Sequence, residues 1–78
     1  MNQIYLTRVV NNRARYLKIE YGKTLFDDLF LLKRSYGSVK NSKPTGEKKD
    51  IFYSLSELKK YLDSYLKMKI KKGYEVEE

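Results

Sequence analysis

Hydrophobic and polar residues alternate along the first part of the chain, which is the pattern of strands with one buried face. The run IYLTRVV is rich in β-branched residues and predicts a strand over residues 3–10. Asn11 and Asn12 follow it and predict a tight hairpin turn, because asparagine tolerates the left-handed backbone that such a turn requires. The chain is therefore expected to fold back on itself directly after its first strand.

The second strand shows the cleanest alternation. One side of it carries Arg15, Leu17, Ile19 and Tyr21, and the other side carries Tyr16, Lys18 and Glu20. After a connection over residues 22–28, a third strand is predicted where Phe30, Leu32 and Tyr36 fall on one side. A loop over residues 39–46 contains the only proline, and a fourth strand is predicted over residues 49–53.

A single amphipathic helix is predicted after the fourth strand. Ser54 and Glu57 have the spacing of a capping box, in which the hydroxyl and the carboxylate satisfy free backbone amides of the first turn. One helical face then carries Leu55, Leu58, Leu62, Tyr65 and Leu66. Gly73 is placed for a left-handed C-cap, so the helix is expected to end there.

These elements predict an α+β fold, with an antiparallel β-sheet of about four strands and one C-terminal α-helix packed on one face. A chain of 78 residues is too short to divide its apolar residues between two cores. We therefore expect residues 1–78 to form a single domain.

Lys69 interrupts the apolar stripe of the helix, between the directions of Leu58 and Leu62. One interpretation is a lysine of the last turn whose methylenes pack under Tyr74 while its ammonium reaches past the sheet edge. The other is a functional cation at one end of the seam between helix and sheet. The sequence leaves both interpretations open.

Basic residues outnumber acidic residues by 17 to 10, and a net charge of +7 attracts polyanions. Thirteen of the 17 are lysines, and AT-rich coding would produce the same composition without selection for binding. The distribution is more informative, because residues 8–18 carry four cations and no acid, and residues 33–49 carry six cations against Glu47. A binding surface and merely solvated charge both fit this pattern.

The residue inventory argues against an enzyme and against a metal or cofactor site. The chain has no cysteine and no histidine, so the usual thiolate and imidazole ligands are missing. The only adjacent carboxylates, Asp27 and Asp28, lie in a connection where we expect them to cap a turn or stay solvated. No apolar run is long enough for a signal peptide or a membrane span, so we expect a cytoplasmic monomer without membrane contacts.

Several short motifs resemble the WGR domain family, which is named for a Trp-Gly-Arg triplet. They are NRARYLKIE at residues 12–20, TLF at 24–26, R-x-aromatic-G at 34–37, the Gly46-Glu47 pair and K-x-x-x-G-Y at 69–74. The resemblance covers nearly the whole chain and is closest to small bacterial members. Tyr36 and Gly37 stand where the family has Trp and Gly, whereas Ser38 replaces the Arg and Lys40 replaces a later Gly.

The resemblance implies an antiparallel sheet with one long helix against it, and it implies DNA binding, because the family binds DNA near strand ends in poly(ADP-ribose) polymerases. Tyr36 retains an aromatic face that can stack on a sugar or base. Ser38 cannot supply the bidentate phosphate contact of an arginine, and the loop lysines replace its charge without its geometry.

The sequence therefore predicts a non-enzymatic nucleic-acid-binding module, for DNA rather than RNA, that contacts the phosphate backbone with little sequence specificity. The predicted binding residues are Arg13, Arg15, Lys33, Arg34, Tyr36, Gly37, Ser38, Lys40, Lys43, Lys48, Lys49 and Lys69. A purely structural interpretation, in which Tyr36 caps the rim of the core and Gly37 serves a turn, stays open.

The alternative function is a protein-interaction or scaffold module. It would use the sheet face away from the helix, where Tyr16, Lys18 and Glu20 are expected, because tyrosine combines contact area with a polar tip. The placement of the cations separates the two hypotheses. Convergence of the cations on one face favours nucleic acid, and scatter favours the compositional explanation. The cations concerned are Arg13, Arg15, Arg34 and the loop lysines.

Overall fold

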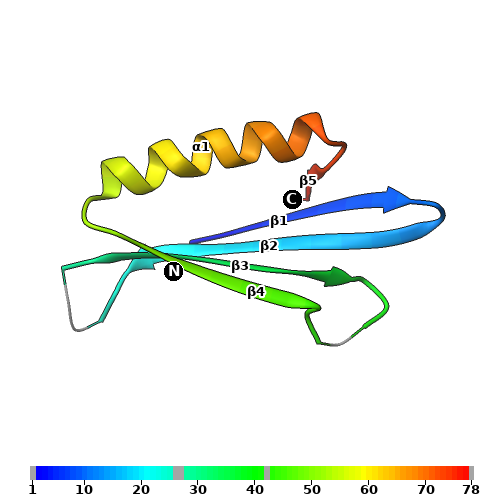
Figure 1. Ribbon diagram of the computed structural model, residues 1–78, viewed down its shortest axis with the longest axis horizontal. Coiled ribbons are helices and arrows are strands. Elements are labelled where there is room, and N and C mark those ends of the chain that lie inside the picture. The colour runs from blue at the N-terminus through cyan, green and yellow to red at the C-terminus, as the bar shows by residue number, and fades with distance from the viewer. Residues whose placement is uncertain (1, 26–27, 42, 78) are drawn as a thin grey trace.

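The structure is a computed structural model that describes residues 2–25, 28–41 and 43–77. An antiparallel sheet of five strands carries one helix along one face (Figure 1). The elements are β1 (Asn2–Val10), β2 (Arg13–Lys23), β3 (Phe30–Ser38), β4 (Gly46–Phe52), α1 (Leu55–Lys71) and β5 (Glu75–Glu77). The strand order is β4-β3-β2-β1-β5, so α1 connects one edge of the sheet to the other. The predicted α+β class is confirmed.

β1 and β2 form a two-residue hairpin, as predicted. Asn11 and Asn12 have φ angles of 51° and 63°, the left-handed values that a type I′ turn requires. Pairing runs without interruption from Val10 opposite Arg13 to Asn2 opposite Tyr21. Residues directly opposite each other therefore share one face of the sheet along the whole hairpin.

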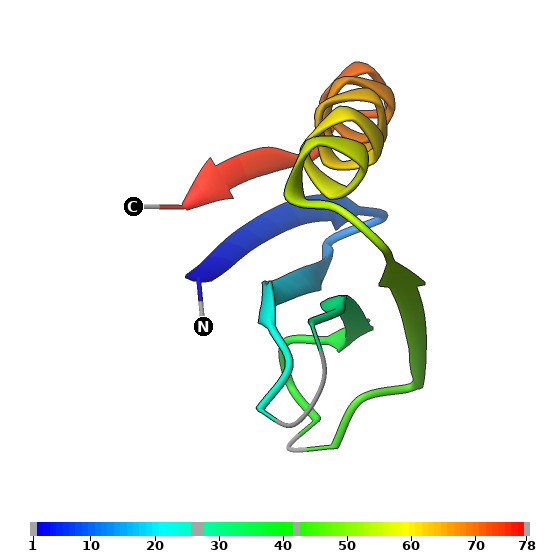
Figure 2. The same cartoon turned by 90° about the vertical axis from the view of Figure 1, so that its left-hand side faces the viewer.

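The core lies between the sheet and α1, which covers one face of the sheet and leaves the other bare (Figure 2). Its buried residues are Leu6, Leu17, Ile19, Leu32, Leu58 and Leu62. The inward sides predicted for β2 and β3 are confirmed, because Tyr21, Phe30 and Tyr36 also pack against this cluster. Leu55 begins the predicted helical stripe but lies at its rim, with 40% of its surface exposed.

Both predicted caps of α1 are present. The Glu57 backbone N–H donates to Ser54 Oγ at 3.2 Å. At the other end, Gly73 has a φ of 106°, and the backbone N–H of Tyr74 donates to the Lys69 carbonyl at 3.1 Å. This is the Schellman arrangement, which turns the chain back and places Tyr74 beside the last helical turn. No helix in the described ranges has the length and hydropathy needed to cross a membrane.

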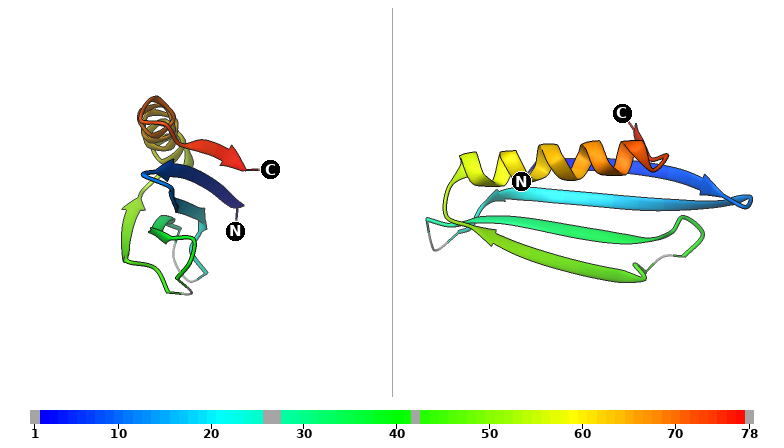
Figure 3. Two further views of the ribbon diagram at one scale, coloured as in Figure 1. Left: turned by 90° about the vertical axis from the view of Figure 1, so that its right-hand side faces the viewer. Right: turned by 45° about the horizontal axis from the view of Figure 1, so that its top comes forward.

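The sheet has five strands, whereas the sequence predicted about four. β5 pairs with the outer edge of β1, with Val76 opposite Leu6, and the Thr7 hydroxyl donates to the Glu77 carboxylate. Two of its three residues are glutamates and all three are exposed, so no hydrophobic alternation marks this strand in the sequence. Backbone pairing directly after the C-cap forms it, and Figure 3 shows it beside β1.

β4 begins at Gly46, earlier than the predicted range of residues 49–53, and it ends before Tyr53, which is 79% exposed. The pairing with β3 explains the difference, because it continues until Gly46 lies opposite Tyr36. Lys48 is therefore a strand residue with a fixed direction and not a loop residue.

A candidate basic site between the sheet and the end of the helix

A cavity of about 310 Å³ opens between the sheet and the last turns of α1. We call it the basic cavity. Its walls come from β2, β3 and β4 on one side and from α1 and the residue that follows its cap on the other. The lining residues are Arg15, Leu17, Arg34, Tyr36, Lys48, Tyr65, Lys69 and Tyr74. Four cations and three tyrosines give the cavity side chains of the kinds that contact anions and aromatic groups.

The sheet register brings the basic side chains to the cavity. Ile19, Arg34 and Lys48 lie opposite one another on β2, β3 and β4, so the two cations share the helix-covered face with the core. Arg8 and Arg15 form another such pair, nearer the hairpin turn. The β1–β2 hairpin extends past the C-terminal end of α1 (Figure 1), so the helix does not cover this part of the face. Charged side chains are tolerated there because water still reaches them.

Tyr36 lies against Gly46 of the neighbouring strand. A Cβ atom at Gly46 would lie 2.4 Å from the Tyr36 hydroxyl oxygen and 2.5 Å from its Cζ. The ring therefore occupies the space that any larger residue would need. Among the described residues, Tyr36 takes part in no ring–ring or cation–π pair, unlike Tyr65 and Tyr74.

Arg34 is held rigidly in the cavity wall. Its Nη2 donates to Asp50 Oδ2 at 2.6 Å, and its Cζ lies 5.0 Å from the ring centre of Tyr65 and 5.8 Å from that of Tyr61. Burial acts to lower the pKa of Arg34, but Tyr61, the hydrogen bond to Tyr65 and Asp50 raise it overall. The side chain is 13% exposed, and its buried Nε has no hydrogen-bond partner. The wall thus contains a fixed positive charge with one unused donor.

Lys69 places its ammonium between two tyrosine rings. Nζ lies 5.5 Å from the ring centre of Tyr65 and 5.6 Å from that of Tyr74. Burial lowers the pKa of Lys69, and nearby cations, first Lys72 and then Arg34, lower it further. The first interpretation is right that Lys69 lies against Tyr74, but the ammonium itself contacts the ring and does not reach past the sheet edge. The second interpretation, a functional cation at the seam between helix and sheet, stays a prediction.

Arg8, Tyr65 and Tyr74 belong to the site but were not among the predicted binding residues. Tyr65 was assigned to the apolar stripe, and burial does raise the pKa of its hydroxyl, although its hydrogen bond and charge contact with Arg34 oppose this. The guanidinium carbon of Arg8 lies 5.8 Å from the ring centre of Tyr74. The sequence did contain a signal for Arg8, because a two-residue turn at residues 11–12 puts it opposite Arg15.

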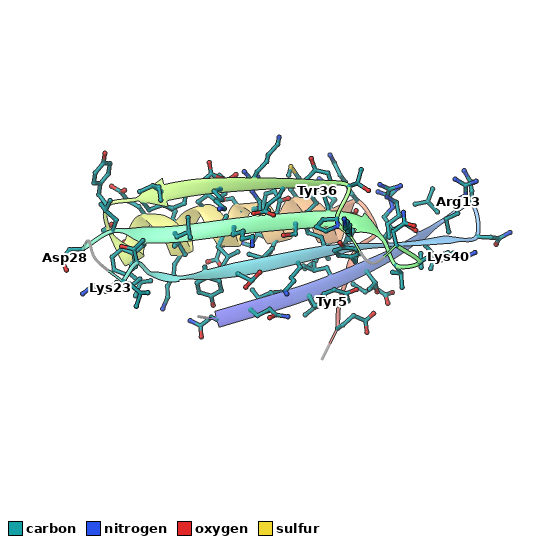
Figure 4. All side chains as sticks on the ribbon, turned by 90° about the horizontal axis from the view of Figure 1, so that it is seen from below. Tyr5, Arg13, Lys23, Asp28, Tyr36 and Lys40 are labelled. Carbon is teal, nitrogen blue, oxygen red and sulfur yellow. The ribbon has the colours of Figure 1, made fainter. Side chains whose placement is uncertain are left out.

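A second hollow, of about 470 Å³, adjoins the basic cavity through Arg15, which lines both. Its lining residues are Arg13, Ala14, Arg15, Ser38, Lys40, Asn41 and Thr45. Figure 4 shows Arg13 and Lys40 at the same end of the molecule, far from Lys23 and Asp28 at the other end. We call Arg13, Arg15 and Lys40 the outer basic surface.

The remaining predicted residues lie elsewhere. Lys33 and Gly37 of β3 and Lys49 of β4 alternate with the inward-facing residues of their strands. Their side chains and backbone positions therefore belong to the opposite face of the sheet. The Nζ atoms of Lys33 and Lys49 lie 3.4 Å and 3.9 Å from one carboxylate oxygen of Glu47. Lys43 is exposed in the β3–β4 loop. The predicted set is therefore divided between two faces and a loop. Only part of it meets the convergence that the nucleic-acid hypothesis requires, and the scatter of Lys33, Lys43 and Lys49 fits the compositional explanation.

The carboxylate pair at residues 27–28 is described only in part, because Asp27 lies outside the described residues. Asp28 forms an ion pair of 3.2 Å with Lys23. Within the described ranges, no group of three or more acidic, histidine or cysteine side chains could hold a metal ion.

The sheet face away from the helix carries the residues predicted for it. Tyr5 and Tyr16 stack there, with ring centres 5.8 Å apart and planes inclined by 14°. Lys18 and Glu20 lie beside them, with 3.8 Å between Nζ and the carboxylate. This face is aromatic and of mixed charge, in contrast to the basic cavity.

Comparisons with protein-family models, with characterised proteins and with solved structures find no match for this chain.

Proposed function

We propose that this chain is a non-enzymatic module that binds nucleic acid through the phosphate backbone. The observation that carries the proposal is the position of Arg15, which joins the outer basic surface to the basic cavity. Basic side chains from β2, β3, β4, α1 and the β3–β4 loop are thereby continuous at one end of the molecule. Such an arrangement attracts a polyanion and gives it several phosphate contacts.

The contacts available at this surface are suited to the backbone and not to base edges. α1 uses its inner side for the core, so it is not free to enter a groove as a recognition helix. Arginine and lysine side chains supply phosphate contacts, which fix position but carry no sequence information. We propose DNA as the ligand because of the resemblance to WGR domains, with Tyr36 as the aromatic contact.

The test compares two double variants that lose the same charge. Arg13→Gln with Lys40→Gln removes two cations of the outer basic surface, and Lys33→Gln with Lys49→Gln removes two cations of the opposite face. Fluorescence anisotropy with a labelled duplex, over a series of salt concentrations, gives the slope of log K against log salt. We expect the first variant to flatten the slope by about 1.8 log units, at about 0.9 per lost duplex-phosphate contact. We expect the second variant to match the wild type.

Equal flattening in both variants would mean that net charge alone drives binding, and no change in either would remove the outer basic surface from the proposal. Two duplexes of unrelated sequence should bind with the same affinity, because backbone contacts do not distinguish them. Labelled single strands and RNA of equal length test the preference for DNA in the same titration.

The second candidate function is protein interaction through the sheet face away from the helix. The observation in its favour is the half-buried stack of Tyr5 on Tyr16, since paired tyrosines are common anchors at interfaces. It becomes the leading function if neither double variant changes binding while Tyr16→Ala abolishes association with a purified partner.

A further inference from the structure

We propose that the basic cavity is a receptor for a nucleoside monophosphate, with the phosphate among Arg15, Lys48 and Lys69 and the base against Tyr36. This inference goes beyond the proposed function, because it requires no polymer and makes no use of Arg13 or Lys40. It is argued from the size, the charge and the aromatic walls of the cavity.

The size of the cavity fits a small ligand. Its volume of about 310 Å³ is at the lower end of the range of small-molecule sites, which is about 300–1,000 Å³. The sheet forms one wall, and the last turns of α1 with Tyr74 form the other. A single nucleotide matches this volume, whereas the middle of a duplex can present only its surface phosphates to the rim, so DNA would reach Tyr36 only with a strand end.

The positive charge of the cavity favours a ligand that carries more than one negative charge. Four cations line it, and Asp50 is the partner of Arg34 alone. Within the described ranges, Arg15, Lys48 and Lys69 form no ion pair. A phosphate monoester carries a charge of about −1.5 to −2 at neutral pH, compared with one charge for a backbone diester, and so neutralises more of this excess.

Two of the four cations, Arg34 and Lys69, are also held in positions that a ligand can use. Asp50 and Tyr65 fix Arg34, and its Nε still lacks an acceptor. Lys69 is held between Tyr65 and Tyr74. Burial, and after it the neighbouring cations, lower the pKa of Lys69, so a bound anion offsets both effects. A site whose donors are fixed before binding loses little conformational entropy when the ligand arrives.

The aromatic walls favour a phosphate that carries a ring. Tyr65 and Tyr74 already hold cations against their faces, but Tyr36 is engaged by neither a cation nor another ring among the described residues. Its position over Gly46 fixes the ring at the cavity wall. A purine stacked on Tyr36 would have its phosphate toward the basic side chains, and stacking on an aromatic ring suits any base.

The test is isothermal titration calorimetry with AMP, adenosine and inorganic phosphate as the three probes. We expect AMP to bind at least about tenfold more tightly than adenosine or inorganic phosphate, because only AMP supplies both the charge-assisted contacts and the stacked ring. Equal binding of AMP and inorganic phosphate would overturn the role of Tyr36. Equal binding of AMP and adenosine, or no binding of AMP at millimolar concentration, would overturn the inference.

Matched variants locate the site. Lys69→Gln and Lys48→Gln should each weaken AMP binding about tenfold or more, while Lys67→Gln, on the exposed side of the same helix, should leave it unchanged. Tyr36→Leu should weaken the binding of AMP and leave the weak binding of inorganic phosphate unchanged. Circular-dichroism melts confirm that each variant is folded, and Lys48→Gln serves alone if the Lys69 variant does not fold. An equal loss in the Lys67 variant would contradict the site.

The source of the nucleotide and the independence of the two proposals are tested together. A 5′-phosphorylated trinucleotide that binds more tightly than AMP would identify strand ends as the source, and the reverse order would identify the free nucleotide. The double variant Arg13→Gln with Lys40→Gln should bind AMP like the wild type. If that variant loses duplex binding alone, both proposals stand. If AMP fails to bind while the duplex result holds, only the cavity inference fails.

Discussion

Replacing Leu58 by alanine tests whether α1 packs on the sheet in the orientation described. Leu58 is fully buried and is one of six buried apolar core residues in the described part of the chain. Leucine-to-alanine changes at such positions cost about 2–5 kcal/mol, the sum of lost burial and the cavity left behind. A domain of this length has a total stability of about 4–12 kcal/mol, at about 0.05–0.15 kcal/mol per residue. The loss is therefore a large part of the whole.

The expected result is a large fall in the melting temperature. Taking about 3 kcal/mol, and about 4–8 °C per kcal/mol for a domain of this size, Leu58→Ala should lower the midpoint by about 12–24 °C. The assay is thermal unfolding followed by circular dichroism at 222 nm.

Leu55→Ala is the matched control, because it makes the same chemical change one turn earlier on the same helix. Leu55 is 40% exposed, so its truncation loses less burial and should cost about 1 kcal/mol or less. Alanine favours the helix slightly at both positions, which leaves the comparison unaffected. Equal shifts for the two variants, or a larger shift for Leu55→Ala, would refute the packing of α1 through Leu58.

Two further predictions concern the basic cavity. Gly46→Ala puts a methyl group into the Tyr36 ring and should cost about 1–3 kcal/mol by overpacking, measured by the same melt, and it should weaken AMP binding because the ring is displaced. Lys69→Gln tests the lowered pKa of this lysine. The unfolded chain keeps the proton up to the ordinary pKa of 10.5, whereas the folded chain releases it at a lower pH. Between these two pKa values the unfolded state binds more protons, so the free energy of unfolding of the wild type rises with pH. The variant lacks this rise, so its stability relative to wild type should fall as the pH approaches 10.5 from neutral. A difference that is constant with pH would contradict the assignment.

Strands and caps that carry a local signal were predictable from the sequence. The paired asparagines gave the hairpin, because both adopt left-handed backbone angles. Ser54 and Gly73 correctly predicted the two ends of the helix, because side-chain capping and a positive φ each depend on only a few neighbouring residues. β5 was missed because its formation depends on the free edge of β1, and a three-residue strand with two glutamates has no pattern of its own.

The site was predictable only in part, for a related reason. The sequence identified the basic segments, but the face on which each cation lies is decided by strand register. Lys48 and Lys49 are neighbours in the chain, yet Lys48 lines the basic cavity and Lys49 lies on the opposite face beside Glu47. The prediction began β4 at Lys49, so it left Lys48 in a loop without direction. A shift of one residue in the register of a strand moves every side chain to the other face of the sheet, and the number of charges in a segment does not reveal this shift.

The wall of the basic cavity is built by the same features that end the helix. The left-handed backbone of Gly73 turns the chain, so that Tyr74 packs against Lys69 and the next residues pair with β1 as β5. The cap, the cavity wall and the fifth strand are thus consecutive parts of one short segment. Weak pairing of β5 would loosen Tyr74 and, with it, the ring that holds Lys69 in place. A cation in an otherwise apolar helical stripe is therefore tolerated because the chain that follows it supplies the second aromatic face.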